Sequence, residues 1–506
     1  MSFLQNYKNF YTWKVLSIFT GFLSLFIVVP HITNNQELFG IYSFCISFTL
    51  YLSYADIGFL NAGQKFAAEE YIKGNRIEEI NILGFTGAIL LLMILPFSIG
   101  MIWLSFNPEF LIFDLTRGGQ EVAGKLFFII GIFTPLQLIL QRLIHSILAI
   151  RIEDFVALRI EVFFNIIKVF SVYYFFNKGR YMIVEYFTFI TIISMLSSII
   201  VLFIIRVTKN YDFIRLIKAI RLKRKYWAMT KNLAFSSFFS TIGFILYYEL
   251  DLIIVGKIYG VESVAIYAIG FTFLNFLRTF WNTIFAPYQQ RFNHFIAKNH
   301  HQKFKTLMIN IIDYSMPLCF ITITILYLIA DEMVVLWVGS GYTQSIVILK
   351  TLMIGTVFTF ITHPAKQVFS ANLNYKYVYL SGIALPLTFF ICLFLIMPIY
   401  GMIGVAISKT LAIFIGFLIC LWGISSSINP LLIFKKWFFR IAFTLIILSP
   451  LIINSLLSLF SIDNENSLQL ISLIILTGFT ILILYLSILM TSKKQRMELS
   501  LLINNL

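Results

Sequence analysis

The chain contains few charged residues. Asp, Glu, Lys and Arg make up only 12% of its 506 residues, whereas 59% are hydrophobic and the mean hydropathy is +0.89. Soluble domains contain about 25% charged residues, so this composition excludes an ordinary water-soluble domain. Long polar stretches are missing too. The longest runs only from Arg206 to Lys231, so we expect no sizeable domain outside a membrane.

Residue patterns typical of catalytic, metal-binding or nucleotide-binding sites are also missing. The four cysteines lie in apolar segments and form no CxxC motif, which indicates buried thiols rather than a disulfide or a metal site. The six histidines show no ligand spacing, and no GxxxxGK phosphate loop, nucleophile motif or acidic metal-binding pair is present. We therefore expect no enzymatic activity, no cofactor and no metal. Transport driven by ATP within this chain is excluded, while a separate ATPase subunit stays open.

Long apolar segments, in contrast, follow one another along almost the whole sequence. An α-helix needs about 20 apolar residues to cross roughly 30 Å of hydrocarbon. Fourteen such segments predict an all-α polytopic membrane protein. Their approximate spans are 13–32, 39–60, 82–105, 124–150, 155–177, 182–206, 233–256, 264–286, 309–330, 346–370, 378–398, 402–422, 438–458 and 468–490.

The distribution of Lys and Arg predicts the topology. Basic residues gather in alternate loops, and the loops on the other side are sparse and often acidic, as at Glu37, Asp331 and Asp463. By the positive-inside rule both termini are cytoplasmic, which requires an even number of helices. The net charge of +15 is mostly this topology signal, so we expect no nucleic-acid partner.

The stretch 206–231 is strongly basic, with Asp212 its one acid. Phe213, Ile214, Ile217 and Ile220 recur between the bases at helical spacing. This pattern predicts an amphipathic helix on the anionic inner leaflet. The alternative is a connector that is positive only because it lies inside.

This stretch separates two groups of six predicted helices. Six is an even number, so the two halves would share one orientation, a common transporter design. A shift of 225 residues aligns five identities between the halves, for example Ile41 with Ile266 and Tyr42 with Tyr267. The predicted domains are an N-lobe (1–206, helices 1–6), a basic cytoplasmic linker (207–231), a C-lobe (232–424, helices 7–12) and a C-terminal part (425–506, helices 13–14 and a cytoplasmic tail).

Ionisable residues inside the predicted spans are the candidates for function. Each charge at the centre of a membrane helix costs about 2.5–3.5 kcal/mol, so these groups must pair with each other or line water. The basic candidates for a substrate-binding cationic cavity are Arg142, His145, Arg159, Lys168, Arg278, Lys366 and Lys409. The acidic candidates for pairing or ion coupling are Glu161, Glu185, Glu249 and Asp251.

Polar residues form stripes on helices from both halves. Glu161, Asn165 and Lys168 lie on one helix face, and a second stripe ends at His145 on the preceding helix. A third stripe surrounds Arg278. Stripes of this kind are what a water-filled central cavity requires, and a cationic cavity predicts an anionic cargo.

Structural alternatives remain open for most of these candidates. Arg142, Lys168 and Arg278 could instead pair with Glu161, Glu185 or Asp251. Arg159 and Lys366 lie close enough to the inner surface for their charged ends to reach water. Glu249 and Asp251 lie near the outer end of the seventh helix, and they could couple an ion or only cap and pair.

Three segments carry a resemblance to a known family. They are Gly40-Ile41-Tyr42 with Asp56–Ala62; Asp251–Gly256 with Gly260-Val261 and Ala265-Ile266-Tyr267; and Trp337-Val338-Gly339 with Tyr342. Over residues 10–425 the chain resembles bacterial polysaccharide flippases of the multidrug/oligosaccharidyl-lipid/polysaccharide (MOP) exporter superfamily. The resemblance implies two six-helix lobes around a central cavity, as in the multidrug (MATE) exporters, with helices 13 and 14 as additions.

The resemblance also implies a function. Such a protein moves a polyprenyl-pyrophosphate-linked oligosaccharide, a repeat unit of O-antigen, capsule or exopolysaccharide, between leaflets of the bacterial cytoplasmic membrane by alternating access. Its partners would be this lipid-linked oligosaccharide, membrane lipids and other polysaccharide-assembly proteins. Three alternatives stay open: a peptidoglycan-precursor flippase, a drug or metabolite antiporter of the same fold, and a polytopic glycan polymerase or ligase.

Overall fold

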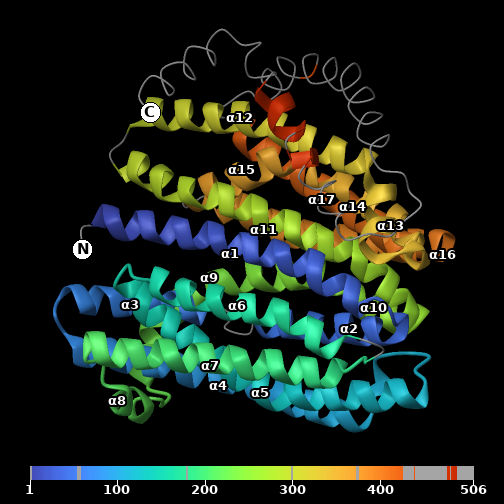
Figure 1. Ribbon diagram of the computed structural model, residues 1–506. Helices are drawn as coiled ribbons and strands as arrows, with labels where there is room; N and C mark the ends of the chain where they lie inside the picture. The colour runs from blue at the N-terminus through green and yellow to red at the C-terminus, as the bar shows by residue number, and fades with distance from the viewer. Residues whose placement is uncertain are drawn as a thin grey trace. The chain divides into compact units, whose positions relative to one another are not determined.

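The computed structural model describes residues 3–53, 58–177, 180–297, 300–371 and 375–425, and beyond them 438, 476–478 and 480–486 (Figure 1). Helices make up nearly all of these residues, and no strand occurs among them. The all-α prediction is therefore confirmed. The two C-terminal helices predicted at 438–458 and 468–490 lie largely outside the described residues, as do Asp56 and Ile57.

The described helices follow one another through short connections. In chain order they are α1 (Phe3–Ile32), α2 (Gln36–Ser53), α3 (Phe59–Ile72), α4 (Arg76–Phe106), η1 (Pro108–Phe110), α5 (Arg117–Ile150), α6 (Phe155–Phe175), α7 (Ile183–Lys209), α8 (Phe213–Lys218), α9 (Arg224–Tyr248), α10 (Asp251–Tyr259), α11 (Val261–Ala297), α12 (His301–Leu328), α13 (Ala330–Val338), η2 (Ser340–Tyr342), α14 (Gln344–Thr356), α15 (Thr359–Ala371), α16 (Tyr375–Tyr400) and α17 (Met402–Ser425).

Many of these helices are long and apolar enough to cross a membrane. Eight helices in the described part meet this condition, and the pair Gln344–Thr356 and Thr359–Phe369 meets it jointly with a bend of 48°. A helix also lies at each of the first twelve predicted spans. Where the sequence predicts one segment at 233–256, the structure has α9 and α10, with a break at Glu249 and Leu250. The chain is a multi-pass membrane protein.

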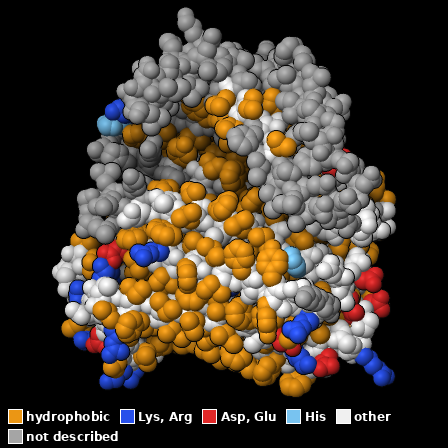
Figure 2. Space-filling model, viewed as in Figure 1, with side chains coloured by type: hydrophobic (Ala, Val, Ile, Leu, Met, Phe, Trp, Pro, Cys, Tyr) orange, Lys and Arg blue, Asp and Glu red, His pale blue; other side chains and the backbone are white. Residues whose placement is uncertain are grey.

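The described helices group into two compact units, Met1–Ala268 (unit 1) and Ile269–Leu506 (unit 2). The boundary falls within α11. The lobe boundaries predicted from the sequence at 206 and 232 stay a prediction. In unit 1, apolar side chains cover the middle of the face that Figure 2 shows, and charged side chains gather toward the ends of its helices. This is the distribution expected for helices that lie in hydrocarbon between two aqueous surfaces.

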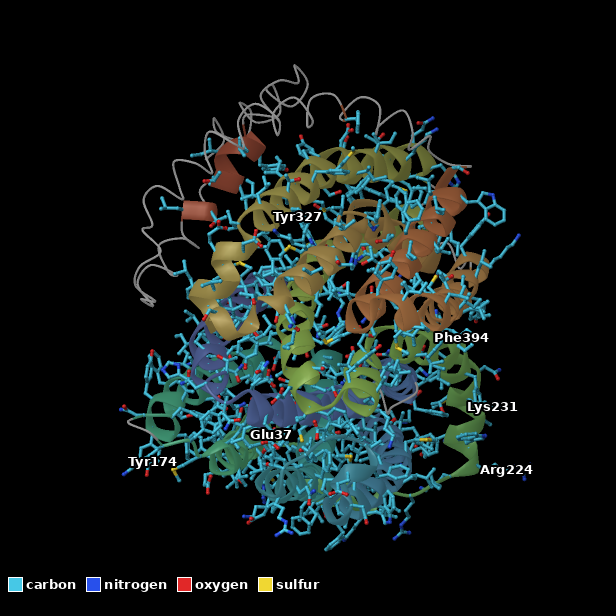
Figure 3. The ribbon with its side chains drawn as sticks, turned by 90° about the vertical axis from the view of Figure 1, so that its right-hand side faces the viewer. Glu37, Tyr174, Arg224, Lys231, Tyr327 and Phe394 are labelled. Carbon is cyan, nitrogen blue, oxygen red and sulfur yellow. The ribbon has the colours of Figure 1, made fainter. Side chains whose placement is uncertain are left out.

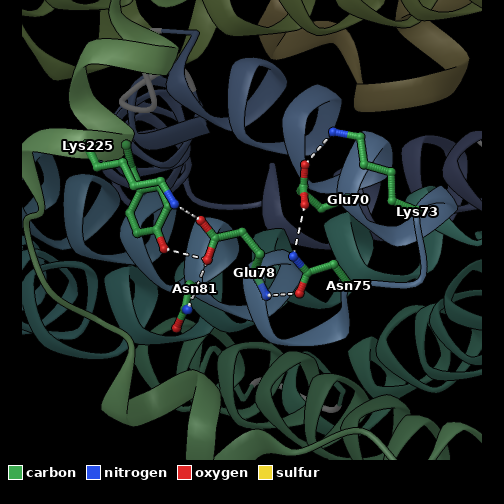
Figure 4. Close-up of polar contacts among 7 residues, drawn as sticks. Glu70, Lys73, Asn75, Glu78, Asn81 and Lys225 are labelled. Atoms are coloured by element: carbon green, nitrogen blue, oxygen red, sulfur yellow. Dashed lines mark hydrogen bonds and ion pairs between the residues drawn. The ribbon is translucent and has the colours of Figure 1, made fainter.

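Polar side chains fix the starts of the long helices in unit 1. Asn75 caps α4 by accepting the N–H of Glu78 at 3.3 Å. Glu78 in turn accepts hydrogen bonds from Lys225 and from the Tyr226 hydroxyl, which joins the start of α9 to the start of α4 (Figure 4). Residues that the sequence places nearly 150 positions apart are thereby held together.

The start of α5 is held in a similar way by Glu37, in the first turn of α2 (Figure 3). The Glu37 carboxylate accepts the backbone N–H of Thr116 at 2.9 Å and its hydroxyl at 2.8 Å. The Thr116 hydroxyl oxygen also caps α5 by accepting the N–H of Gly119 at 3.0 Å. A Cβ at position 119 would clash with Oε1 of Glu37, so a larger residue there would displace the carboxylate that binds Thr116.

The basic linker folds back onto unit 1. Its helix α8 is shorter than the sequence predicts, and Asp212 caps it by accepting the N–H of Arg215 at 2.9 Å. Leu216 is buried in the core, while Ile214 and Ile217 remain exposed. At Gly84 on α4, a Cβ would lie 2.5 Å from the Ala219 side chain and 2.6 Å from its backbone, so only glycine permits this close approach.

A buried ion pair lies beneath this linker. The Nη2 atom of Arg151 is 2.8 Å from Oε1 of Glu79, and the two side chains are 4% and 0% exposed. The Arg151 guanidinium lies over the rings of Tyr71 and Tyr211, at 4.6 and 5.2 Å from their centroids. It also donates to the carbonyl oxygen of Ile147 at 2.8 Å. One cation therefore joins α3, α4, the end of α5 and the linker.

Removing one member of this pair should destabilise unit 1. We expect Arg151→Met to lower the free energy of unfolding by about 3–5 kcal/mol, because it leaves the Glu79 carboxylate buried without its cation. The double variant Glu79→Gln/Arg151→Met should recover part of that loss. The measurement is unfolding of the purified protein in detergent micelles.

The exposed pair of Lys125 and Glu121 provides the matched control. Lys125→Met removes a base of the same kind of ion pair, and we expect it to cost less than about 1 kcal/mol because water screens this pair. Equal losses for Arg151→Met and Lys125→Met would show that the buried pair contributes no special stability.

Candidate functional site

Unit 1 contains a polar cluster between two of its membrane helices. We call it the α5–α6 polar cluster: Gln137, Gln141, His145, Glu161, Asn165 and Lys168. The Glu161 carboxylate accepts a hydrogen bond from Nε2 of Gln141 at 2.9 Å and lies 2.8 Å from Nε2 of His145. The side chains of His145 and Glu161 are 29% and 23% exposed, so both lie partly inside the helical packing.

Lys168 completes this cluster from the α6 side. Its Nζ atom donates to Oδ1 of Asn165 at 3.2 Å and lies within electrostatic range of Glu161. The structure thus brings together the polar stripes that the sequence placed on two consecutive helices. Because Glu161 faces both His145 and Lys168, the cluster contains an acid to balance its bases.

The other unit 1 candidates of the sequence analysis lie at separate places. Arg142 is half-buried on α5, one turn before Ser146, whose hydroxyl donates to the Arg142 carbonyl oxygen at 2.8 Å. Glu185 is exposed in the first turn of α7, with Lys125 in electrostatic range. A carboxylate is stabilised in that first turn by the helix dipole.

Glu249 and Asp251 lie at the break between α9 and α10, and both are fully buried. The Tyr267 hydroxyl donates to Oδ2 of Asp251 at 2.5 Å. Asp251 is also the first residue of α10, where the helix dipole favours a negative charge. This arrangement stabilises the break and suits the pairing interpretation of Asp251.

Unit 2 contains a basic cluster on α11 and α15, formed by Arg278, His363 and Lys366. We call it the α11–α15 basic cluster. The His363 ring stacks on Phe285, with centroids 5.5 Å apart and planes 9° from parallel. Arg278 and Lys366 both lie within electrostatic range of His363. The structure thus places both Arg278 and Lys366 near His363, and the Lys366 side chain is exposed. The sequence analysis missed His363, although its position one turn before Lys366 was a usable signal.

Buried polar atoms without hydrogen-bond partners occur on the same two helices as this basic cluster. Within the described part of unit 2, they include Oδ1 of Asn275, Nε1 of Trp281 and Oε1 of Gln367. Asn275 and Trp281 stand three residues before and after Arg278, and Gln367 follows Lys366. An unsatisfied buried polar group costs about 1–3 kcal/mol, so each needs an explanation such as a bound ligand. Together these groups offer donors and acceptors for a polar anion.

Lys409 lies on α17 and is fully buried in unit 2. Its Nζ atom is 4.6 Å from the centroid of the Phe271 ring. A desolvated ammonium over an aromatic face is stabilised by about 2 kcal/mol. A packing role accounts for Lys409 more directly than the predicted role in a cavity.

Arg159 is exposed on α6 at the edge of an apolar groove of unit 1, which also includes Trp13 and Ile200. It lies five residues after Asp154 and forms no hydrogen bond or ion pair with any described residue. Across the described ranges of the chain, no group of three or more His, Cys, Asp or Glu side chains could hold a metal ion.

Comparison with known proteins finds similar solved structures but no matching sequence family. No family model and no curated protein matches the sequence. Among solved structures, the lipid II flippase MurJ in an inward closed conformation superposes with a TM-score of 0.66 at 17% identity, covering 95% of this chain and 98% of that one.

Multidrug transporters of the same superfamily are similar as well. An inward-facing MATE transporter gives a TM-score of 0.60 at 12% identity, covering 82% of this chain and 94% of that one. A MOP-superfamily transporter from Pyrococcus furiosus is described as having a binding pocket of reverse polarity. It gives a TM-score of 0.59 at 12% identity, covering 84% of this chain and 96% of that one. The chain therefore has the fold that these MOP-superfamily transporters share.

Proposed function

We propose that the chain is a flippase for a polyprenyl-pyrophosphate-linked oligosaccharide, a repeat unit of O-antigen, capsule or exopolysaccharide. It would move this cargo from the inner to the outer leaflet of the bacterial cytoplasmic membrane by alternating access, with both of its termini in the cytoplasm. The observation that carries the proposal is the α11–α15 basic cluster with its unpartnered polar atoms. The shared fold with a lipid II flippase supports the same substrate class.

The chemistry of this cluster suits a diphosphate that bears sugars. The guanidinium of Arg278 can bind phosphate oxygens bidentately, and Lys366 adds a compact positive charge. The indole N–H of Trp281 can donate to a phosphate or a sugar oxygen. The amide oxygens of Asn275 and Gln367 are acceptors, and sugar hydroxyls are donors that would satisfy them.

The α5–α6 polar cluster suits a neutral ligand better than an anion. Glu161 contributes one negative charge beside His145 and Lys168, so this cluster attracts an anion less than the α11–α15 basic cluster does. Its amide side chains, Gln137, Gln141 and Asn165, can exchange hydrogen bonds with neutral groups such as sugars. We therefore assign the diphosphate to the α11–α15 basic cluster. Other polysaccharide-assembly proteins would supply and consume the cargo.

A second candidate is a flippase for a peptidoglycan precursor. The similarity to MurJ favours it, because that structure covers nearly the whole of both chains. A drug antiporter is favoured less by the site, since a basic cluster repels cationic drugs. The two flippase candidates predict different accumulating lipids, so one experiment separates them.

That experiment is depletion of the protein from its host, followed by mass spectrometry of lipid-linked glycans with a leaflet-accessibility assay. We expect a complete polyprenyl-linked oligosaccharide to accumulate in the cytoplasmic leaflet, because the upstream synthesis would continue without export. Accumulation of a peptidoglycan precursor instead would establish the second candidate. An incomplete or unpolymerised glycan already facing outward would point to an enzyme, and unchanged glycans with altered drug sensitivity to an antiporter.

Neutralising the basic cluster should slow transport strongly. We expect Arg278→Gln/Lys366→Gln to lower the flipping rate about a hundredfold, because each lost charge-assisted contact costs roughly tenfold. The measurement is flipping of the lipid-linked oligosaccharide in proteoliposomes, normalised to the amount of folded protein.

The matched control is Arg224→Gln/Lys231→Gln, which removes two exposed bases of α9 (Figure 3). It has the same net-charge change and should leave the flipping rate within about twofold of the original protein, since neither base belongs to the α11–α15 basic cluster. Full transport by Arg278→Gln/Lys366→Gln would remove the diphosphate assignment.

A further inference from the structure

Arg159 is a charged residue in an apolar place. It lies four positions after Phe155, the first residue of α6, which is about 6 Å along the helix at 1.5 Å per residue. Its side chain is exposed, and it has no hydrogen bond or ion pair with any residue the structure describes. A lone cation in the hydrocarbon is unfavourable, so it requires water or an anion at the headgroup level.

The groove beside Arg159 is apolar and formed by three helices. It has a volume of about 500 Å³, and its walls include Trp13 of α1, Phe163 and Ile166 of α6, and Ile200 of α7. This volume falls in the range of small-molecule sites, ~300–1,000 Å³. Arg159 is the one charged residue among the side chains that line the groove.

Charge and apolar surface are separated along the groove. Ile166 lies seven residues beyond Arg159, about 10 Å deeper along α6. Trp13, at the other wall, is followed in α1 by Lys14, which lies within electrostatic range of Asp154. Because Asp154 offsets Lys14, Arg159 is left as the base without an acid.

We propose that this groove binds one anionic phospholipid of the inner leaflet. Its phosphate would lie on the Arg159 guanidinium, and an acyl chain would follow Phe163 and Ile166 between α1 and α7. A guanidinium binds phosphate oxygens bidentately. A headgroup that also carries a cation is disfavoured, because Arg159 repels it and no described acid lines the groove to attract it. The site therefore selects an anionic lipid over a zwitterionic one.

This lipid would stabilise unit 1 by joining three helices. A ligand that binds only the folded protein raises its stability in proportion to the logarithm of ligand concentration over Kd. The effect should therefore be visible as a rise in the unfolding temperature. It does not depend on the cargo, so the proposal stands apart from the proposed function.

The test uses the full chain, purified in detergent and freed of lipid, and compares Arg159→Gln with the original protein. Dioleoyl-phosphatidylglycerol and dioleoyl-phosphatidylcholine, which have the same acyl chains, are titrated in turn. Native mass spectrometry counts the bound lipids, and thermal unfolding reports stability. We expect the original protein to bind one phosphatidylglycerol with a Kd about tenfold lower than that of Arg159→Gln. Arg224→Gln, which removes an exposed base elsewhere, should behave like the original protein.

A second variant tests the apolar part of the site and keeps the charge. Ile200→Trp should fill the groove and lower the retention of phosphatidylglycerol although Arg159 is present. Equal binding of the two lipids by the original protein would mean a nonspecific annular lipid and would overturn the proposal. Equal phosphatidylglycerol binding by Arg159→Gln would overturn it too. Loss of flipping in Arg159→Gln with lipid binding unchanged would instead place Arg159 on the path of the cargo.

Discussion

The ion pair of Glu79 and Arg151 joins α3, α4, the end of α5 and the linker of unit 1. It is buried, and aromatic rings from α3 and the linker take the place of water around the guanidinium. A buried pair adds little stability compared with apolar packing, but each partner becomes costly once the other is missing. The pair therefore favours one packing arrangement over others. Both charges are satisfied only when α3, α4, α5 and the linker come together in this arrangement.

A buried charge needs a partner, and this requirement also applies to the other charged residues in the membrane helices. Lys168 and His145 face the acid Glu161, Asp251 accepts the hydroxyl of Tyr267, and Lys409 lies over an aromatic ring. These groups are satisfied inside the protein. Arg278 and Lys366 lie near another titratable side chain, His363, on helices that also carry buried amide and indole atoms without hydrogen-bond partners among the described residues. The anionic cargo proposed above would supply partners for those atoms.

Much of the fold could be predicted from the sequence, because the thickness of the hydrocarbon sets the length of each apolar segment. The breaks between α9 and α10 and between α14 and α15 could not be predicted. Apolar residues on both sides of Glu249 and Leu250 predicted one segment at 233–256, and the 48° bend between α14 and α15 lies inside the single span predicted at 346–370. A change of direction depends on packing with neighbours that are distant in sequence, and hydropathy contains no such information.

For the site, helical spacing placed Glu161, His145 and Lys168 correctly on facing stripes, because residues three and four apart share a face. It could not show that Arg159, on the same helix as Glu161, lies in an apolar groove with Trp13, a residue of α1. It also missed His363, because its neighbours Arg278 and Phe285 belong to another helix. Contacts between helices decide which charge is satisfied, and these contacts appear only in three dimensions.

The separation of Glu79 from Arg151 also has a consequence for synthesis of the chain. The two residues are 72 positions apart, the difference between 79 and 151. At roughly 5–20 residues per second, about 4–14 s pass between their appearance during translation. Until then Glu79 has no Arg151 beside it, so the packing of α3, α4 and the linker around this ion pair can be completed only after the end of α5 has been synthesised.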